Sequence, residues 1–137
     1  MGITVGSILA SKLQKMKGFT DFDLSMLPKG LSVERLVKAL NFLSPSIIII
    51  HGSKVSKKKF SNKPRSDLDI VCVSAKAAFW PIEELIKNAR KNFGAQEVDI
   101  DLSIVTYNGL LSIVKGESSI SRSFNHGFSI LQCEEAT

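Results

Sequence analysis

The sequence predicts an α/β fold, in which helices pack on a small mixed β-sheet. Three observations support this prediction. Residues 47–50 are four isoleucines, a β-branched run apolar on both faces, as expected of a central buried strand. Residues 97–106 alternate between apolar and polar side chains, as in a strand with one buried face. The segments before, between and after these strands carry apolar residues at helical spacing.

The chain has 137 residues, the length of one ordinary domain. It is 44% hydrophobic and 23% charged, a balance typical neither of a disordered chain nor of a membrane protein. We expect a single domain over 1–137, with an N-terminal helical extension of about 1–30 and a core of about 31–133.

Two helices are predicted before the first strand. Thr4 can cap the first, which Gly18 would end, and Ser32 can cap the second. Their apolar positions recur every three or four residues: Val5, Ile8, Leu9, Leu13 and Met16, then Val33, Leu36, Val37, Leu40 and Leu43.

Gly52 ends the isoleucine strand, and a second buried strand begins near Leu68. A third helix follows, with Pro81 in its first turn and Gly94 as its cap. Its inward side chains would be Ile82, Leu85, Ile86, Ala89 and Phe93.

The third strand, 97–106, places its apolar and acidic residues on opposite faces. Asn108 would cap a last helical region, interrupted near Gly116, and Gly127 releases the chain into a short final strand.

Several functional classes are disfavoured. The two cysteines form no disulfide framework, and neither they nor His51 and His126 stand at a metal-ligand spacing. The sequence begins without the pattern of a signal peptide, and no stretch is long enough for a transmembrane helix. We therefore expect a cytoplasmic protein with no membrane partner.

Positive charge gathers in one segment of a chain whose formal net charge is +5. Six cationic side chains lie within twelve residues: Lys54, Lys57, Lys58, Lys59, Lys63 and Arg65. Such a run is by default a solvated loop, but it also suits an anionic ligand.

Acidic residues follow this loop at the start of the second strand. Asp67 and Asp69 project to the same side, about 6 to 7 Å apart. They could cap the strand in solvent, pair with the loop lysines, or bind Mg²⁺, which prefers carboxylate and phosphate oxygens. The third strand adds Asp99 and Asp101 on one face. Carboxylates on neighbouring strands can hold two metal ions about 3.5 to 4 Å apart and support phosphoryl transfer.

The Gly52–Ser53 pair suits a phosphate as well, because glycine allows close backbone approach and serine adds donors. The alternative is a plain strand-ending turn. A Walker A motif is absent.

The segment IIIIHGSKVSKKKFSNKPRSDLDIVCV resembles the signature of the DNA polymerase β superfamily of nucleotidyltransferases: a strand, Gly-Ser, a loop and Asp-x-Asp. EVDIDLSIVT resembles the later strand with the third aspartate, and SRSFNHGFSIL is similar to the closing segment of the minimal domains. The resemblance covers about 33–131.

This resemblance implies roles for individual residues. Asp67, Asp69 and Asp101 would bind the metal and be catalytic, with Asp99 as the alternative third carboxylate. Gly52, Ser53, Lys54 and Ser66 would bind the nucleotide. Lys54 stands near the position where small members often carry an arginine, so the triphosphate contacts would differ in detail.

The implied activity is transfer of a nucleoside monophosphate from an NTP, with ATP the first candidate, to a hydroxyl acceptor. Two Mg²⁺ ions, or Mn²⁺ in their place, would assist, and pyrophosphate would leave. The sequence does not identify the acceptor, for which a protein and RNA are candidates.

Two other functions stay open. The first is an antitoxin of the minimal nucleotidyltransferase type, which would pair with a helical HEPN-like protein. Without such a partner, the chain could instead form a homo-oligomer. The second is an inactive nucleic-acid-binding module that uses the basic loop.

Overall fold

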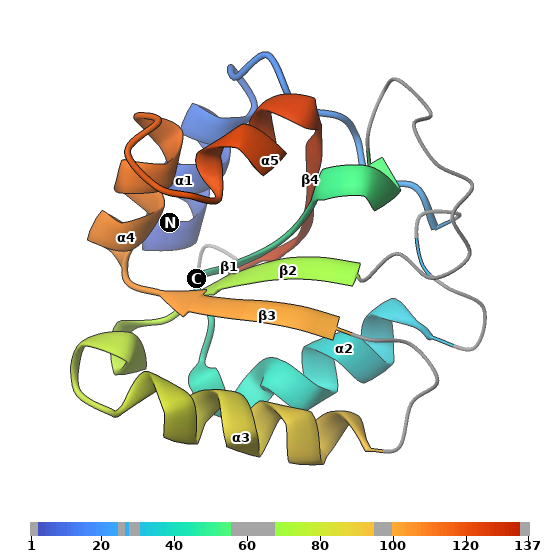
Figure 1. The fold of residues 1–137 in the computed structure, drawn as a ribbon, viewed down its shortest axis with the longest axis vertical. Coiled ribbons are helices and arrows are strands. Elements are labelled where there is room, and N and C mark those ends of the chain that lie inside the picture. Colours follow the sequence, from blue (N-terminus) through green and yellow to red (C-terminus); the bar gives the residue numbers. More distant parts are fainter. Residues whose placement is uncertain (1–2, 25–26, 28–30, 56–67, 95–99, 135–137) are drawn as a thin grey trace.

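The computed structural model describes residues 3–24, 27, 31–55, 68–94 and 100–134 (Figure 1). The predicted class is confirmed, since a mixed sheet carries helices on it. In chain order the elements are α1 (Val5–Leu13), α2 (Val33–Leu40), β1 (Ile47–His51), β2 (Leu68–Val73), α3 (Ile82–Phe93), β3 (Ile100–Val105), α4 (Tyr107–Val114), α5 (Ser121–His126) and β4 (Phe128–Cys133). Short 3₁₀ turns are η2 (Asn41–Leu43), η3 (Gly52–Val55) and η4 (Ala75–Ala78).

The strands lie in the order β3-β2-β1-β4. β1 pairs antiparallel with both of its neighbours, whereas β2 and β3 are parallel and are joined through α3. The prediction of a central strand is confirmed, because Ile47 to Ile50 are fully buried in β1. β2 and β3 begin on the right in Figure 1, near η3, where β1 ends.

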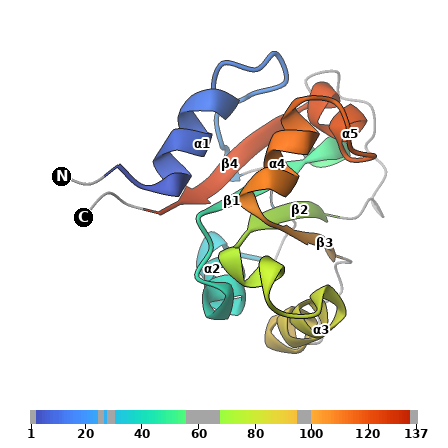
Figure 2. The same cartoon turned by 90° about the vertical axis from the view of Figure 1, so that its left-hand side faces the viewer.

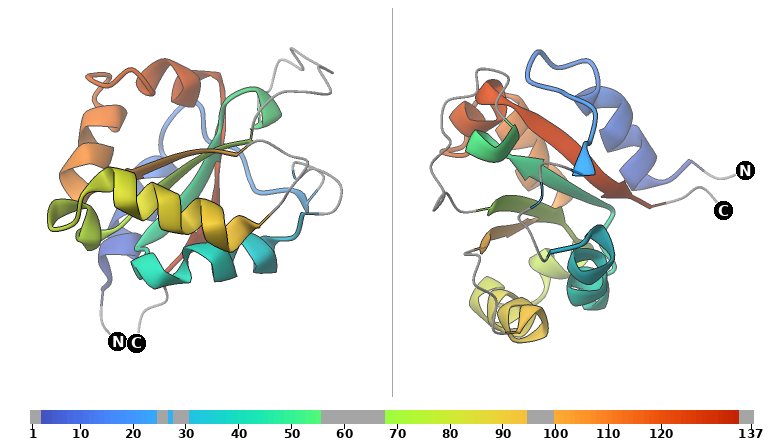
Figure 3. Two further views of the ribbon diagram at one scale, coloured as in Figure 1. Left: turned by 60° about the horizontal axis from the view of Figure 1, so that its bottom comes forward. Right: turned by 90° about the vertical axis from the view of Figure 1, so that its right-hand side faces the viewer.

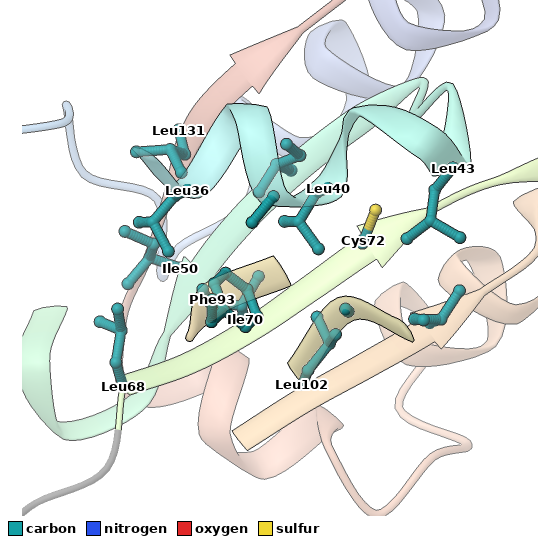
Figure 4. Close-up of a cluster of buried hydrophobic side chains, with 14 of the residues drawn as sticks. Leu36, Leu40, Leu43, Ile50, Leu68, Ile70, Cys72, Phe93, Leu102 and Leu131 are labelled. Atoms are coloured by element: carbon teal, nitrogen blue, oxygen red, sulfur yellow. The ribbon is translucent and has the colours of Figure 1, made fainter. Parts of the chain in front are cut away.

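Helices cover both faces of the sheet, as Figure 2 shows: α1, α4 and α5 on one side, α2 and α3 on the other. Figure 3 shows α2 and α3 side by side beneath the strands. Alternation along each strand divides the apolar side chains between two cores. The α2/α3 core contains Leu36, Leu40, Leu43, Ile50, Leu68, Ile70, Cys72, Phe93, Leu102 and Leu131 (Figure 4). The opposite core contains Leu9, Leu13, Ile47, Ile49, Val71, Val73, Leu110, Ile113, Phe124 and Phe128.

The predicted caps of α1 and α2 are confirmed. Thr4 and Ser7 form a reciprocal capping box, and the Ser32 hydroxyl accepts from the backbone N–H of Arg35. α1 nevertheless ends at Leu13, so the predicted end at Gly18 is wrong. A Cβ on Gly18 would lie 2.1 Å from the carbonyl oxygen of Phe124, so this glycine serves close packing against α5.

Two details of the second half differ from the expectation. Thr106, not Asn108, caps α4, because its hydroxyl accepts from the N–H of Gly109 at 3.2 Å. Ile82, predicted to face inward, is 36% exposed, and Phe79 and Trp80 before it are exposed as well. Helical spacing predicts the direction of a side chain but not how far neighbouring elements cover it. The predicted interruption at Gly116 is confirmed, since this residue, with φ +82°, lies between α4 and α5.

The described helices include none long and apolar enough to cross a membrane.

Candidate active site

One row of residues crosses the whole sheet at the edge where β2, β3 and β4 begin and β1 ends. In the register of the strands, Asp101 of β3 is opposite Asp69 of β2, Asp69 is opposite His51 of β1, and His51 is opposite Phe128 of β4. Directly opposite residues share a face and lie on strands about 4.8 Å apart. Two carboxylates and an imidazole therefore stand next to one another.

This row lies on the α1/α4/α5 face of the sheet. Side chains alternate along a strand, and Phe128 belongs to the core on that face. Asp69 is half-buried and Asp101 is exposed, so the row opens toward solvent from the centre of the sheet to its β3 edge. The two carboxylates are therefore accessible from solvent on that side.

Gly52 lies directly against the first carboxylate. Its φ is +87°, a left-handed conformation that favours glycine, and its N–H donates to the carbonyl oxygen of Gly127 at 3.0 Å. A Cβ at this position would lie 2.6 Å from Oδ2 of Asp69 and 3.0 Å from the hydroxyl oxygen of Ser123. Only glycine lets the backbone turn this close to the aspartate.

The turn after Gly52 is short and anchored. η3 runs from Gly52 to Val55, and buried Val55 joins the α2/α3 core. The backbone of Ser53 and Lys54 therefore belongs to a turn at the sheet edge, beside Asp69. Successive backbone N–H groups in such a turn can form an anion-binding concavity.

His51 is a buried polar residue of the site that sequence reasoning missed. It is 6% exposed, and its Nδ1 is hydrogen-bonded to the hydroxyl of Ser123 at 2.7 Å. Burial lowers the pKa of His51 from 6.5 to about 4, against an opposing effect of the Asp101 charge, so the imidazole is neutral at pH 7. The ring also contacts Phe124, with centroids 5.0 Å apart.

Ser123 was also missed as a site residue. It lies on α5, which packs against η3. One usable signal was present: a histidine that ends an otherwise apolar buried strand, immediately before Gly-Ser, requires a polar partner. Nothing local to the sequence identifies Ser123 as that partner.

The predicted site residues divide into two groups. The structure brings together Gly52, Asp69 and Asp101. Asp67, Ser66, Asp99 and most of the basic loop lie outside the described residues, as do the side chains of Ser53 and Lys54.

In the part of the chain that the structure describes, no three His, Cys, Asp or Glu side chains are grouped as a metal site. The two carboxylates in register still suit Mg²⁺, which is usually held by one or two carboxylates together with water and substrate phosphates. Asp69 and Asp101 would supply those ligands here. The hard oxygen donors disfavour a thiolate- or imidazole-preferring metal.

Comparison with family models, curated proteins and solved structures finds no match to this chain. The functional assignment therefore depends on the motifs and on the geometry of the site.

Proposed function

We propose that this protein is a Mg²⁺-dependent nucleotidyltransferase, which transfers a nucleoside monophosphate from an NTP to an acceptor hydroxyl. One observation carries the proposal. Asp69 and Asp101 are direct register partners on one face of the sheet, and Asp69 lies against the Gly52 turn. Two carboxylates that suit a cation are thus adjacent to a turn that suits a phosphate.

Each part of this arrangement has a task in the proposed reaction. The turn would receive the phosphates through the backbone N–H groups of Ser53 and Lys54, because the N–H of Gly52 itself donates to Gly127. Asp69, between the turn and Asp101, would hold the metal that contacts those phosphates. Asp101, at the exposed end of the row, would face the acceptor and accept the proton of its hydroxyl. Bound Mg²⁺ would supply neutralisation of the charge that develops on the phosphoryl and leaving oxygens.

The proposed transfer needs no reactant other than the NTP and the acceptor. The acceptor oxygen forms a bond to the α-phosphorus, the bond from that phosphorus to the bridging oxygen breaks, and pyrophosphate leaves with the bond electrons. The protein contributes mainly orientation and fixed charge, which supply most of the catalysis in phosphoryl transfer.

The test is incubation with each of the four α-labelled NTPs, Mg²⁺ and candidate acceptors, including RNA and cell extract. The native protein should label an acceptor, while Asp69→Asn, Asp101→Asn and the double variant Asp67→Asn/Asp69→Asn should not. Asp21→Asn, the same change at an exposed residue of the segment between α1 and α2, is the matched control and should retain activity. Equal labelling by native protein and the Asp69 variant would contradict the proposal.

A further inference from the structure

We propose that Ser123 is a further phosphate-binding residue, whose hydroxyl donates to the triphosphate at the Gly52 turn and is positioned there by His51. This inference rests on the proposed function. It identifies a residue from α5, near the far end of the chain, as part of the nucleotide site.

The first argument is position. The hydroxyl oxygen of Ser123 lies 3.0 Å from the point where a Cβ of Gly52 would be, and Oδ2 of Asp69 lies 2.6 Å from the same point. The serine and the aspartate therefore flank the glycine at close range. A phosphate bound at the turn would therefore lie close to the serine hydroxyl.

The second argument is hydrogen-bonding capacity. A hydroxyl offers one donor and two acceptor sites, and the bond to Nδ1 of His51 uses a single one of them. If Nδ1 carries the proton and donates, the hydroxyl proton of Ser123 is free for a ligand oxygen. Ser123 is half-buried while His51 is buried, so Ser123 is the more accessible residue of the pair.

The third argument is rigidity. His51 cannot move easily, because its ring contacts Phe124, which in turn stacks on Phe128 with centroids 4.9 Å apart. The same helix end also fixes the turn, since the N–H of Gly52 donates to the carbonyl oxygen of Gly127. A donor held this way loses little conformational freedom when a ligand binds.

The fourth argument is charge. The acidic row beside the turn repels a triphosphate, so donors near Asp69 are needed to hold the anion. An uncharged hydroxyl provides such a donor without drawing the carboxylate away from its cation.

The experiment measures binding of Mg·ATP and of Mg·tripolyphosphate, which lacks a base and a sugar, by calorimetry. Ser123→Ala should weaken both about tenfold, the usual effect of losing one hydrogen bond to a charged group. Ser123→Thr, which keeps the hydroxyl, should restore most of the affinity. Ser121→Ala is the matched control: it removes a serine on the same helix whose hydroxyl donates to the carbonyl oxygen of Ile113, and it should lower stability without changing either affinity.

The role of His51 is tested by a double-mutant cycle. His51→Phe keeps an aromatic ring beside Phe124 but removes Nδ1. It should weaken Mg·tripolyphosphate binding in the native background and have little further effect in the Ser123→Ala background. Equal effects of His51→Phe in both backgrounds would show that His51 acts independently of Ser123 and would overturn its positioning role.

Two results would overturn the assignment of Ser123. In the first, Ser123→Ala binds Mg·tripolyphosphate as tightly as the native protein does. In the second, the variant loses Mn²⁺ binding measured by electron paramagnetic resonance without any phosphate, which would assign the serine to orienting Asp69. In either case the native protein still binds the two probes and transfers the nucleoside monophosphate, so the proposed function stands. If the native protein binds neither probe, the proposed function fails and this inference with it.

Discussion

The carboxylate of Asp69 occupies the space that a side chain at residue 52 would need. The contact joins the end of β1 to the start of β2, and the ideal Cβ of Gly52 would lie 2.6 Å from Oδ2. Real Cβ atoms essentially never approach another heavy atom so closely, so even the smallest side chain must displace the aspartate or the turn.

Gly52→Ala should therefore lose both stability and transfer activity. The methyl group would strain a backbone at φ +87° and push Asp69 aside, and we expect a loss of about 2 to 3 kcal/mol in the free energy of unfolding. Urea denaturation and the labelled-NTP assay measure the two effects.

Gly116→Ala is the control, because Gly116 has a similar φ of +82° but no atom within 4 Å of its ideal Cβ. It should cost about 1 kcal/mol from backbone strain and leave transfer unchanged. Similar activity losses in both variants would mean that the contact with Asp69 is unimportant.

Acid should destabilise the fold through His51. Its folded pKa of about 4 lies below its ordinary value of 6.5, so the unfolded chain takes up a proton that the folded chain excludes. The contribution is constant above about pH 6.5, is lost progressively as pH falls toward 4, and amounts to roughly 3 kcal/mol at most. Denaturation in EDTA-containing buffers from pH 4 to 8 measures it.

His51→Phe should flatten this pH dependence, since phenylalanine does not titrate. Asp69 and Asp101 share the sheet row with His51, and the charge of Asp101 raises the pKa of His51. Asp101→Asn should therefore lower the folded pKa of His51, so that the loss still begins near pH 6.5 but continues to a lower pH. An unchanged pH profile in His51→Phe would assign the acid sensitivity to other groups.

The two cysteines should differ in reactivity. Cys72 is fully buried, and burial raises the pKa of its thiol to about 12, so it should react with a disulfide reagent at pH 8 only when the protein unfolds. Cys133 is partly exposed, although burial and the charge of Glu134 raise its pKa as well. It should react first, but more slowly than a free thiol.

Mass spectrometry after timed labelling identifies the modified cysteine. Cys133→Ser should leave a native protein that reacts only in denaturant. Rapid labelling of Cys72 in that variant without denaturant would contradict the burial of the β2 strand.

Local patterns predicted most of the architecture. A run of isoleucines is stable only where both faces are covered, and β1 is central and fully buried. Turn and cap chemistry placed Ser32 and Gly94, because these depend on the neighbouring backbone alone. Where a cap had a nearby competitor, as Thr106 did with Asn108, sequence reasoning chose the wrong one.

The site was predictable only in part. Alternation fixes the face that Asp101 occupies, but the pairing of Asp101 with Asp69 depends on the register of two strands joined through α3. The contact between His51 and Ser123 joins residues 72 positions apart, and no local pattern encodes such a distance. Sequence reasoning can therefore name the carboxylates but not the groups that surround the glycine.

The central place of β1 has a consequence for hydrogen exchange. Strands are hydrogen-bonded to it on both sides, and helices cover both of its faces. Its backbone amides should exchange with deuterium only through global opening of the molecule. Gly52 directly follows β1, so the turn that would bind the phosphates is attached to the strand that we expect to open least.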